Sequence, residues 1–215
     1  MNLWLSLCVN GTLLLGGLLG CSGLPREQGS APDTLAPAAG TVRETATTQL
    51  EGGDTTAFQR ALSLMRAQRY AEAEMLWKSI AESSQQSVLA LLNLGITYSR
   101  LGKLVQAERN FRQVLQQDAG NAIAYNELGI VERKAGRFQQ AEDAYRHALQ
   151  LHPEYALAHL NLGILCDLYL QKVDCAMSHY REYRRLAGGE DPPVDLWIED
   201  LGRRYPDRQW PRIGE

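Results

Sequence analysis

Small and aromatic residues recur through the middle of this chain at one fixed interval of 34 positions. One column of small residues contains Ala61, Gly95, Gly129 and Gly163. A second small column contains Ala73, Ala107, Ala141 and, one residue late, Ala176. An aromatic column contains Trp77, Phe111, Tyr145 and, one residue late, Tyr180. This period with these offsets is typical of stacked helix–turn–helix units, so the sequence predicts an all-α solenoid.

Each unit is expected to consist of two antiparallel helices that approach closely. A glycine inside a helix costs roughly 1 kcal/mol relative to alanine, so its recurrence at equivalent positions indicates a packing requirement. We expect the small residue of the first helix to face the small residue of the second. The aromatic residue is expected to fill the space between one unit and the next. One unit cannot bury its apolar face alone, so about three or more must stack.

The period divides the middle of the chain into four repeats, which we place at residues 54–87, 88–121, 122–155 and 156–188. Two helices per repeat and one further helix give nine expected helices after the leader. Residues 189–215 are predicted to form a capping helix and a loose tail. The capping helix should begin at Asp191-Pro192, a helix-start signal. An apolar stripe at helical spacing follows and contains Val194, Trp197, Ile198 and Leu201.

The repeats resemble those of the tetratricopeptide repeat family. Three segments carry the resemblance: NLGITYSRLGKLVQAERNFRQVL, NELGIVERKAGRFQQAEDAYRHALQLHP, and HLNLGILCDLYL followed by CAMSHYREY. The resemblance covers about 54–187. Repeat one departs at Arg60 and Ala61, and repeat four carries one extra residue in its turn. The resemblance implies a scaffold that binds other proteins, without catalytic residues or a cofactor, although the ligands of the family are diverse.

The resemblance also implies where a partner would bind, because the first helices of such solenoids line a concave surface. By the family's register the groove residues are Leu92, Asn93, Ile96, Arg100, Asn126, Glu127, Ile130, Arg133, Leu160, Asn161 and Ile164. Each Asn amide can pair with the backbone of a bound peptide or with a neighbouring helix, and both interpretations remain open. The extra Lys residues of the carboxylate-clamp subset are absent, which argues against recognition of a free C-terminal carboxylate.

Residues 1–21 are predicted to be an export signal, with an uncharged, Leu-rich stretch from Leu3 to Leu19. The run Leu18-Leu19-Gly20-Cys21 resembles the lipobox of bacterial lipoproteins, which implies that Cys21 is acylated and becomes the mature N-terminus. In that family a Ser after the Cys, here Ser22, favours the outer membrane. The alternative is an uncleaved single-pass anchor. Residues 22–53, rich in Gly, Ala, Pro, Ser and Thr, are expected to form a disordered tether.

Cys166 and Cys175 remain once Cys8 and Cys21 are assigned to the leader. They fall late in the first helix and early in the second helix of repeat four. Antiparallel helices joined by a short turn would place them opposite each other. A disulfide is therefore predicted for an exported chain, and two buried thiols are the alternative.

The remaining titratable residues indicate no catalytic or metal site. The four histidines, His147, His152, His159 and His179, lack the convergent partners that a zinc site requires. Glu72, Glu74, Glu108 and Glu142 lie on second helices and are predicted to face solvent. The net charge of −3 and the lack of a basic stripe argue against nucleic acid as a partner.

The sequence thus favours a membrane-tethered adaptor of the cell envelope, held by lipid at the outer membrane and facing the periplasm. Its partner would be a protein or peptide segment in assembly or function of a pilus, secretin, cell-wall or TonB-linked machinery. The alternative is an accessory or regulatory subunit of an envelope enzyme. A cytosolic co-chaperone is contradicted by the leader.

Overall fold

The computed structural model describes residues 52–83, 87–189 and 191–210. The predicted leader and nearly all of the predicted tether lie outside the described residues. Contacts along the chain separate residues 1–41 from residues 42–215, and every described residue belongs to the second of these units. No helix among the described residues is both long enough and apolar enough to span a membrane.

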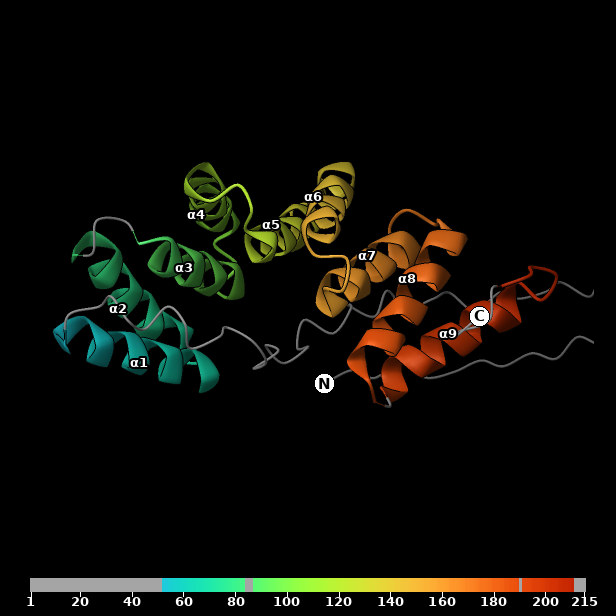
Figure 1. Ribbon diagram of the computed structural model, residues 1–215, viewed down its shortest axis with the longest axis horizontal. Coiled ribbons are helices and arrows are strands. Elements are labelled where there is room, and N and C mark those ends of the chain that lie inside the picture. The colour runs from blue at the N-terminus through green and yellow to red at the C-terminus, as the bar shows by residue number, and fades with distance from the viewer. Residues whose placement is uncertain (1–51, 84–86, 190, 211–215) are drawn as a thin grey trace, which may run out of the picture. The chain divides into compact units, whose positions relative to one another are not determined.

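The described part of the chain contains nine helices and no strand, as predicted. They are α1 (Gly52–Arg66), α2 (Tyr70–Ser83), α3 (Val88–Arg100), α4 (Leu104–Gln117), α5 (Ala122–Lys134), α6 (Phe138–Leu151), α7 (Ala156–Leu168), α8 (Val173–Ala187) and α9 (Pro192–Arg204). Consecutive helices pack in pairs, and the first helices α3, α5 and α7 also contact one another (Figure 1). The first helices therefore form the inner layer of an all-α solenoid of four repeats closed by α9.

The turn inside each repeat contains one residue in the left-handed backbone region. Gly102 and Gly136 have φ of 72° and 76°, a conformation that glycine adopts without steric cost. Gln68 and Gln171 occupy the corresponding place in repeats one and four, with φ of 57° and 55°. All four turns therefore keep a left-handed residue, but the turn of repeat four is one residue longer. The Lys172 amide donates to the carbonyl six residues before it, whereas the equivalent amides of the other repeats donate five residues back.

The helical glycines of the repeats lie against the aromatic ring of the second helix, which corrects the predicted partner. A Cβ added to Gly129 would stand 2.5 Å from the Tyr145 ring, and one added to Gly95 would stand 2.6 Å from Phe111. Gly163 has the same relation to Tyr180, at 2.6 Å. The aromatic column therefore fills the interior of its own repeat, and glycine is needed because a methyl group would collide with the ring.

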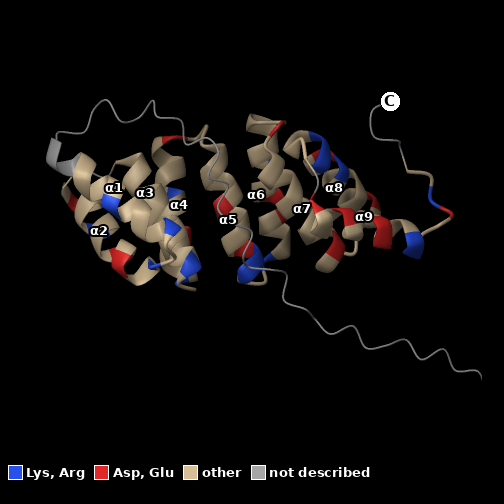
Figure 2. Cartoon of the chain, turned by 90° about the horizontal axis from the view of Figure 1, so that it is seen from below, with Lys and Arg blue, Asp and Glu red and all other residues tan. Residues whose placement is uncertain are grey.

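Ion pairs join each repeat to the next, and they correct the prediction that Glu74, Glu108 and Glu142 face solvent, whereas Glu72 is exposed as predicted. Lys103 Nζ lies 2.6 Å from Glu74, Arg137 Nη2 lies 2.7 Å from Glu108, and Lys172 Nζ lies 2.8 Å from Glu142. Glu74 is only 8 % exposed and Glu142 is fully buried. Basic and acidic residues are interspersed over the helices (Figure 2).

The basic member of each pair stands at the N-cap of a second helix. Lys103, Arg137 and Lys172 precede α4, α6 and α8, and none caps the helix with its side chain. Ser, Thr, Asp or Asn at this place would stabilise the helix by about 1 kcal/mol, and a cation meets the positive end of the helix dipole. The basic residue is explained by its bond to the preceding repeat.

The C-terminal helix α9 caps the solenoid as predicted. Asp191 accepts a hydrogen bond from the Val194 amide, and Val194 and Leu201 are buried. Ion pairs join Asp195 to Arg184 of α8 and Arg204 to Asp167 of α7.

The residues that follow α9 were predicted to be loose, but Arg208 forms an ion pair with Asp174 at the start of α8. This contact ties the described part of the tail, residues 205–210, to the last repeat. Residues 211–215 lie outside the described residues.

We expect Lys172→Ala to lower the free energy of unfolding by about 1–3 kcal/mol, because the fully buried carboxylate of Glu142 in the preceding repeat then keeps only Arg146 of its own helix as a partner. Arg69→Ala is the matched control. Arg69 stands at the same place before α2 but pairs with Glu72 of its own helix, with both side chains exposed, so its loss should leave the free energy of unfolding nearly unchanged. Urea unfolding measures both, and equal effects would contradict a linking role for the inter-repeat pairs.

Candidate functional site

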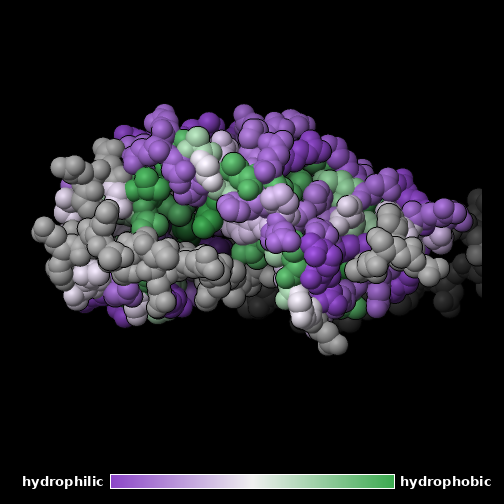
Figure 3. All heavy atoms as spheres, in the orientation of Figure 1, coloured by the Kyte–Doolittle hydropathy of each residue, from purple (hydrophilic) through white to green (hydrophobic). Residues whose placement is uncertain are grey.

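The inner face of α3, α5 and α7 carries the predicted groove residues, but not all of them reach the surface. Four are buried in the contacts between helices: Leu92, Asn126, Leu160 and Ile164. Seven are partly exposed: Asn93, Ile96, Arg100, Glu127, Ile130, Arg133 and Asn161. On the face shown in Figure 3, hydrophobic side chains surface over α3 among hydrophilic neighbours. The accessible face is therefore smaller than predicted, and the four buried residues are corrected to scaffold positions.

The asparagines of this face are largely engaged within the scaffold. Asn161 Nδ2 donates to Asn126 Oδ1 at 2.9 Å, which joins α7 to α5. Asn93 Nδ2 donates to the Leu89 carbonyl of its own helix at 2.8 Å. Of the two interpretations of these amides, the structure therefore favours bonds to the helices. Asn126, only 1 % exposed, is unsuitable as a contact for a partner.

A polar cluster surrounds Arg133 on this face. Arg133 Nη1 lies 3.5 Å from the Tyr169 hydroxyl, and its guanidinium carbon lies 5.8 Å from the Tyr169 ring centroid. The guanidinium also interacts with Tyr145, whose side chain has no exposed surface. Within the described residues, Arg133 Nε and the Tyr145 hydroxyl are buried without a hydrogen-bond partner. Against the effect of burial, Tyr145 raises the pKa of the Arg133 guanidinium, and the guanidinium opposes the rise that burial gives to the pKa of Tyr145, so the phenol oxygen is the acceptor that the guanidinium faces.

Burial sets the protonation of this cluster. It raises the pKa of Tyr145 well above its usual value, so the hydroxyl stays protonated and able to donate. Desolvation also raises the pKa of the nearby Glu127 carboxyl, against the opposing effect of Arg100 and Lys134. The cluster therefore favours the neutral form of its own acid and keeps its donors intact.

Sequence reasoning missed Tyr145 and Tyr169 as candidate site residues, because aromatic residues at helical spacing usually indicate packing. A signal was present in the aromatic column. Repeat two has Phe111 where repeat three has Tyr145, and both rings lie on a glycine. The hydroxyl of Tyr145 is therefore not needed to fill the repeat.

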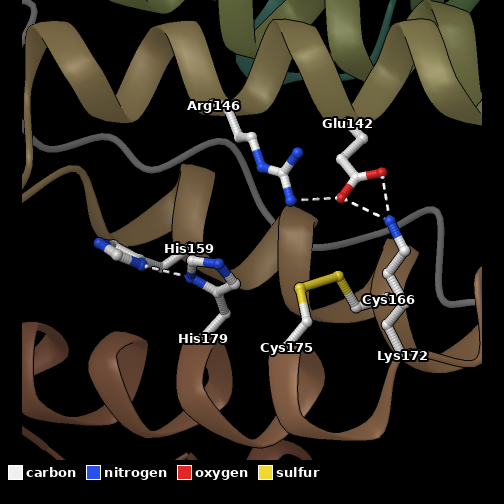
Figure 4. Close-up of a disulfide and its surroundings, with 7 residues drawn as sticks. All are labelled: Glu142, Arg146, His159, Cys166, Lys172, Cys175 and His179. Carbon is white, nitrogen blue, oxygen red and sulfur yellow. Dashed lines mark hydrogen bonds and ion pairs between the residues drawn. A yellow bond between two sulfur atoms is a disulfide. The ribbon is translucent and has the colours of Figure 1, made fainter.

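Repeat four contains a disulfide and a histidine pair (Figure 4). Cys166 and Cys175 are bonded, with their Cα atoms 5.9 Å apart, and they join α7 to α8 across the turn that holds the extra residue. His159 Nδ1 lies 2.9 Å from His179 Nδ1, and His159 Nε2 lies 2.9 Å from the Pro153 carbonyl. Within the described ranges, no three His, Cys, Asp or Glu side chains are grouped to hold a metal ion.

Known protein families match the repeats of this chain. Two models described as tetratricopeptide repeat match residues 87–152 and 126–191. Together with the helix pairs and the glycine–aromatic contacts, these matches show that the chain belongs to the tetratricopeptide repeat family. Members of this family are generally non-catalytic scaffolds for interactions between proteins. A search of curated proteins gives no match.

Solved structures of similar fold come from several sources. A thermophilic tetratricopeptide repeat protein of Thermus thermophilus matches with 22% identity and a TM-score of 0.61, over 70% of this chain and 82% of that chain. Pseudomonas aeruginosa pilF matches with 22% identity and a TM-score of 0.64, over 72% of this chain and 69% of that one. The first repeat domain of Spaghetti (RPAP3), solved with the HSP90 peptide SRMEEVD, matches with 20% identity and a TM-score of 0.53, over 56% and 94%. At these identities the likeness shows the fold.

We expect the stability of the protein to fall as the pH drops from about 6.5 towards 4, because burial and the neighbouring His159 lower the pKa of His179 to about 4. Between these pH values the unfolded chain binds a proton at His179 and the folded chain does not. The free energy of unfolding should therefore fall by less than about 1.4 kcal/mol per pH unit. Urea unfolding across this range measures it. His179→Gln should reduce the slope, whereas His152→Gln, at an exposed turn, should retain it. Equal slopes in the two variants would contradict the assignment of this pH dependence to His179.

Proposed function

We propose that this protein is a non-enzymatic scaffold that binds a segment of a partner protein on the inner face of α3, α5 and α7. The observation that carries the proposal is the combination of partly exposed Ile96 and Ile130 with the guanidinium of Arg133 on one face. Apolar side chains supply binding energy when they are covered, and a few polar groups fix the orientation of the bound segment. An extended or helical segment suits such a surface.

The comparisons support a binding role of this kind. A structural neighbour, the first repeat domain of Spaghetti (RPAP3), was solved with a bound peptide. The partly exposed apolar side chains beside Arg133 on the inner face support a binding role of the same kind.

The sequence of the first 21 residues supports a membrane location, although these residues lie outside the described part of the chain. Acylation at Cys21 would hold the scaffold at the outer membrane, facing the periplasm, through the tether that follows. A disulfide between Cys166 and Cys175 suits an oxidising compartment. The partner would belong to an envelope machinery such as a pilus, a secretin, a cell-wall complex or a TonB-linked system. The alternative is a regulatory subunit of an envelope enzyme.

Binding on the inner face predicts that Ile130→Asp abolishes capture of the partner, because a charge replaces apolar contact area at the centre of the face. A photo-reactive amino acid at Ile96 should form a crosslink in native membranes, and the crosslink should vanish in the Ile130→Asp background. Val105→Asp is the matched control, since Val105 is 80 % exposed on the second helix α4. Circular dichroism must show that both variants are folded. No crosslink from position 96, or a crosslink from that position that survives Ile130→Asp, would count against binding on the inner face.

Lipid anchoring predicts that Cys21→Ser abolishes incorporation of a labelled palmitate analogue and leaves precursor uncleaved or mislocalised. Several acyl chains hold a protein durably, whereas a single chain binds a membrane only marginally. Mass spectrometry of the membrane-bound protein should find an acylated Cys21 at the N-terminus, with Cys8→Ser as the control that changes nothing. An unmodified Met1 on the mature protein would favour the uncleaved anchor.

A further inference from the structure

A groove on the outer layer lies between the second helices α2 and α4, with the first helix α3 as its floor. Its volume is about 580 Å³. Leu91, Leu94 and Tyr98 of α3 form the floor and are buried, and Asn110 of α4, only 7 % exposed, lies beside them. None of the residues assigned to the inner face lines this groove, so it is a separate surface.

Aromatic rings occupy the equivalent places between the later second helices. Tyr125 and His147 stand 34 residues after Leu91 and Gln113, and their rings stack with centroids 5.2 Å apart between α4 and α6. Between α6 and α8 the rings of His159 and His179 lie 5.1 Å apart. In both places one ring comes from the first helix and one from the second helix of the same repeat.

The groove between α2 and α4 has smaller or more flexible side chains where the later repeats have this pair. Leu91 and Gln113 stand in the places of the stacked rings. In addition, α2 contributes Ala81 where α4 contributes Leu115 to the next interval. The space that rings occupy elsewhere therefore stays open here, and an apolar side chain that covered this floor would be stabilised by its removal from water.

The charged groups around the groove carry an excess of one positive charge. Lys78 and Lys103 both bind Glu74, and their ammonium groups lie 5.7 and 5.8 Å from the centroid of the Tyr98 ring. Arg109 and Glu82 line the groove on α4 and α2. Three cations thus meet two carboxylates, so an acidic residue that arrives beside the floor is attracted rather than repelled.

We propose that this groove is a second docking site, which takes one aromatic side chain of a partner protein together with an acidic residue next to it. The stacked rings of the later repeats are the internal precedent for the aromatic side chain, and the excess positive charge selects the acid. The predicted tether, residues 22–53, contains no aromatic residue. The described tail is tied to repeat four through Arg208 and Asp174. The ring is therefore assigned to another chain.

The test titrates the full chain, labelled with nitrogen-15, with three short peptides that have blocked ends. They consist of Ser and Gly around a central pair, which is Glu-Tyr, Glu-Ala or Gln-Tyr. The reporter is the side-chain amide of Asn110 on the floor, which the magnetic field of a nearby ring shifts without direct contact. Asn110→Ala assigns its signals, and Ala144 at the equivalent place of repeat three shows that the fold accepts alanine there.

The Glu-Tyr peptide should shift the Asn110 signals and bind about tenfold more tightly than the Glu-Ala peptide, a ratio typical of an anchoring aromatic side chain. It should bind about threefold more tightly than the Gln-Tyr peptide at low salt, and high salt should remove this smaller difference.

A filled variant closes the groove with the pair that the next repeat contains. Leu91→Tyr combined with Gln113→His should reduce the affinity for the Glu-Tyr peptide about tenfold or more. The matched control is Tyr125→Leu combined with His147→Gln, which should leave the response of the Asn110 signals unchanged. Circular dichroism checks the fold of both. Ala81→Leu, a change at a half-buried wall position, should weaken the same peptide independently.

Several results would overturn the inference. They are Asn110 signals that the Glu-Tyr peptide does not move, equal affinity for the three peptides, and equal affinity for a peptide with Leu in place of Tyr. A dimer that sedimentation detects and the filled variant abolishes would assign the groove to a second copy of this chain.

The outcome is distinguishable from that of the proposed function. If the peptide is lost from the Ile130→Asp variant but still binds the filled variant, it occupies the inner face, and only the outer groove is wrong. If the Glu-Tyr peptide binds at Asn110 while no crosslink forms from position 96, the outer groove stands and the inner face fails.

Discussion

The stacking of the repeats depends on a glutamate of one second helix that binds the basic residue in front of the next second helix. Two of these glutamates, Glu74 and Glu142, have almost no exposed surface, and a buried carboxylate without a cation is strongly destabilising. Each basic residue occupies a cap position where it does nothing for its own helix. The starts of α4, α6 and α8 are thereby coupled to the repeat before each of them, which fixes how the first helices line up on the inner face.

The series of inter-repeat ion pairs begins after the first repeat and ends at the last one. Arg69, in the first repeat, has the same place as Lys103 but pairs with its own helix through Glu72. In the last repeat Met177 replaces the glutamate, and it is buried where no further repeat follows. The capping helix is joined by different pairs, from Arg204 to Asp167 and from Asp195 to Arg184. Charge therefore links the repeats in series, and the glycine–aromatic contact sets the spacing inside each.

The fold was predictable because the small and aromatic columns record helix contacts directly in sequence spacing. The ion pairs were not predicted, although their two columns share the same period, because a glutamate on a second helix usually faces solvent. The informative sign was a basic residue 29 or 30 positions after each glutamate. The groove was predicted too wide, since Leu92 and Asn126 share a helix face with Ile96 and Ile130 but lie inside the contacts between first helices. The predicted lipid site and tether lie outside the described residues.

A binding specificity can depend only on the positions at which the repeats differ. The residues that all repeats share are already used in folding. The aromatic column shows this most clearly. Phe111 fills repeat two with a bare ring, so the hydroxyls of Tyr145 and Tyr180 are surplus to packing. Tyr180 uses its hydroxyl on an acid of the same chain, which ties repeat four to the capping helix through Asp167 and Arg204. Tyr145 has an arginine in place of that acid. Its hydroxyl lies beside the guanidinium of Arg133, a contact that repeat two lacks because it has Phe111 and Ser99 at these places.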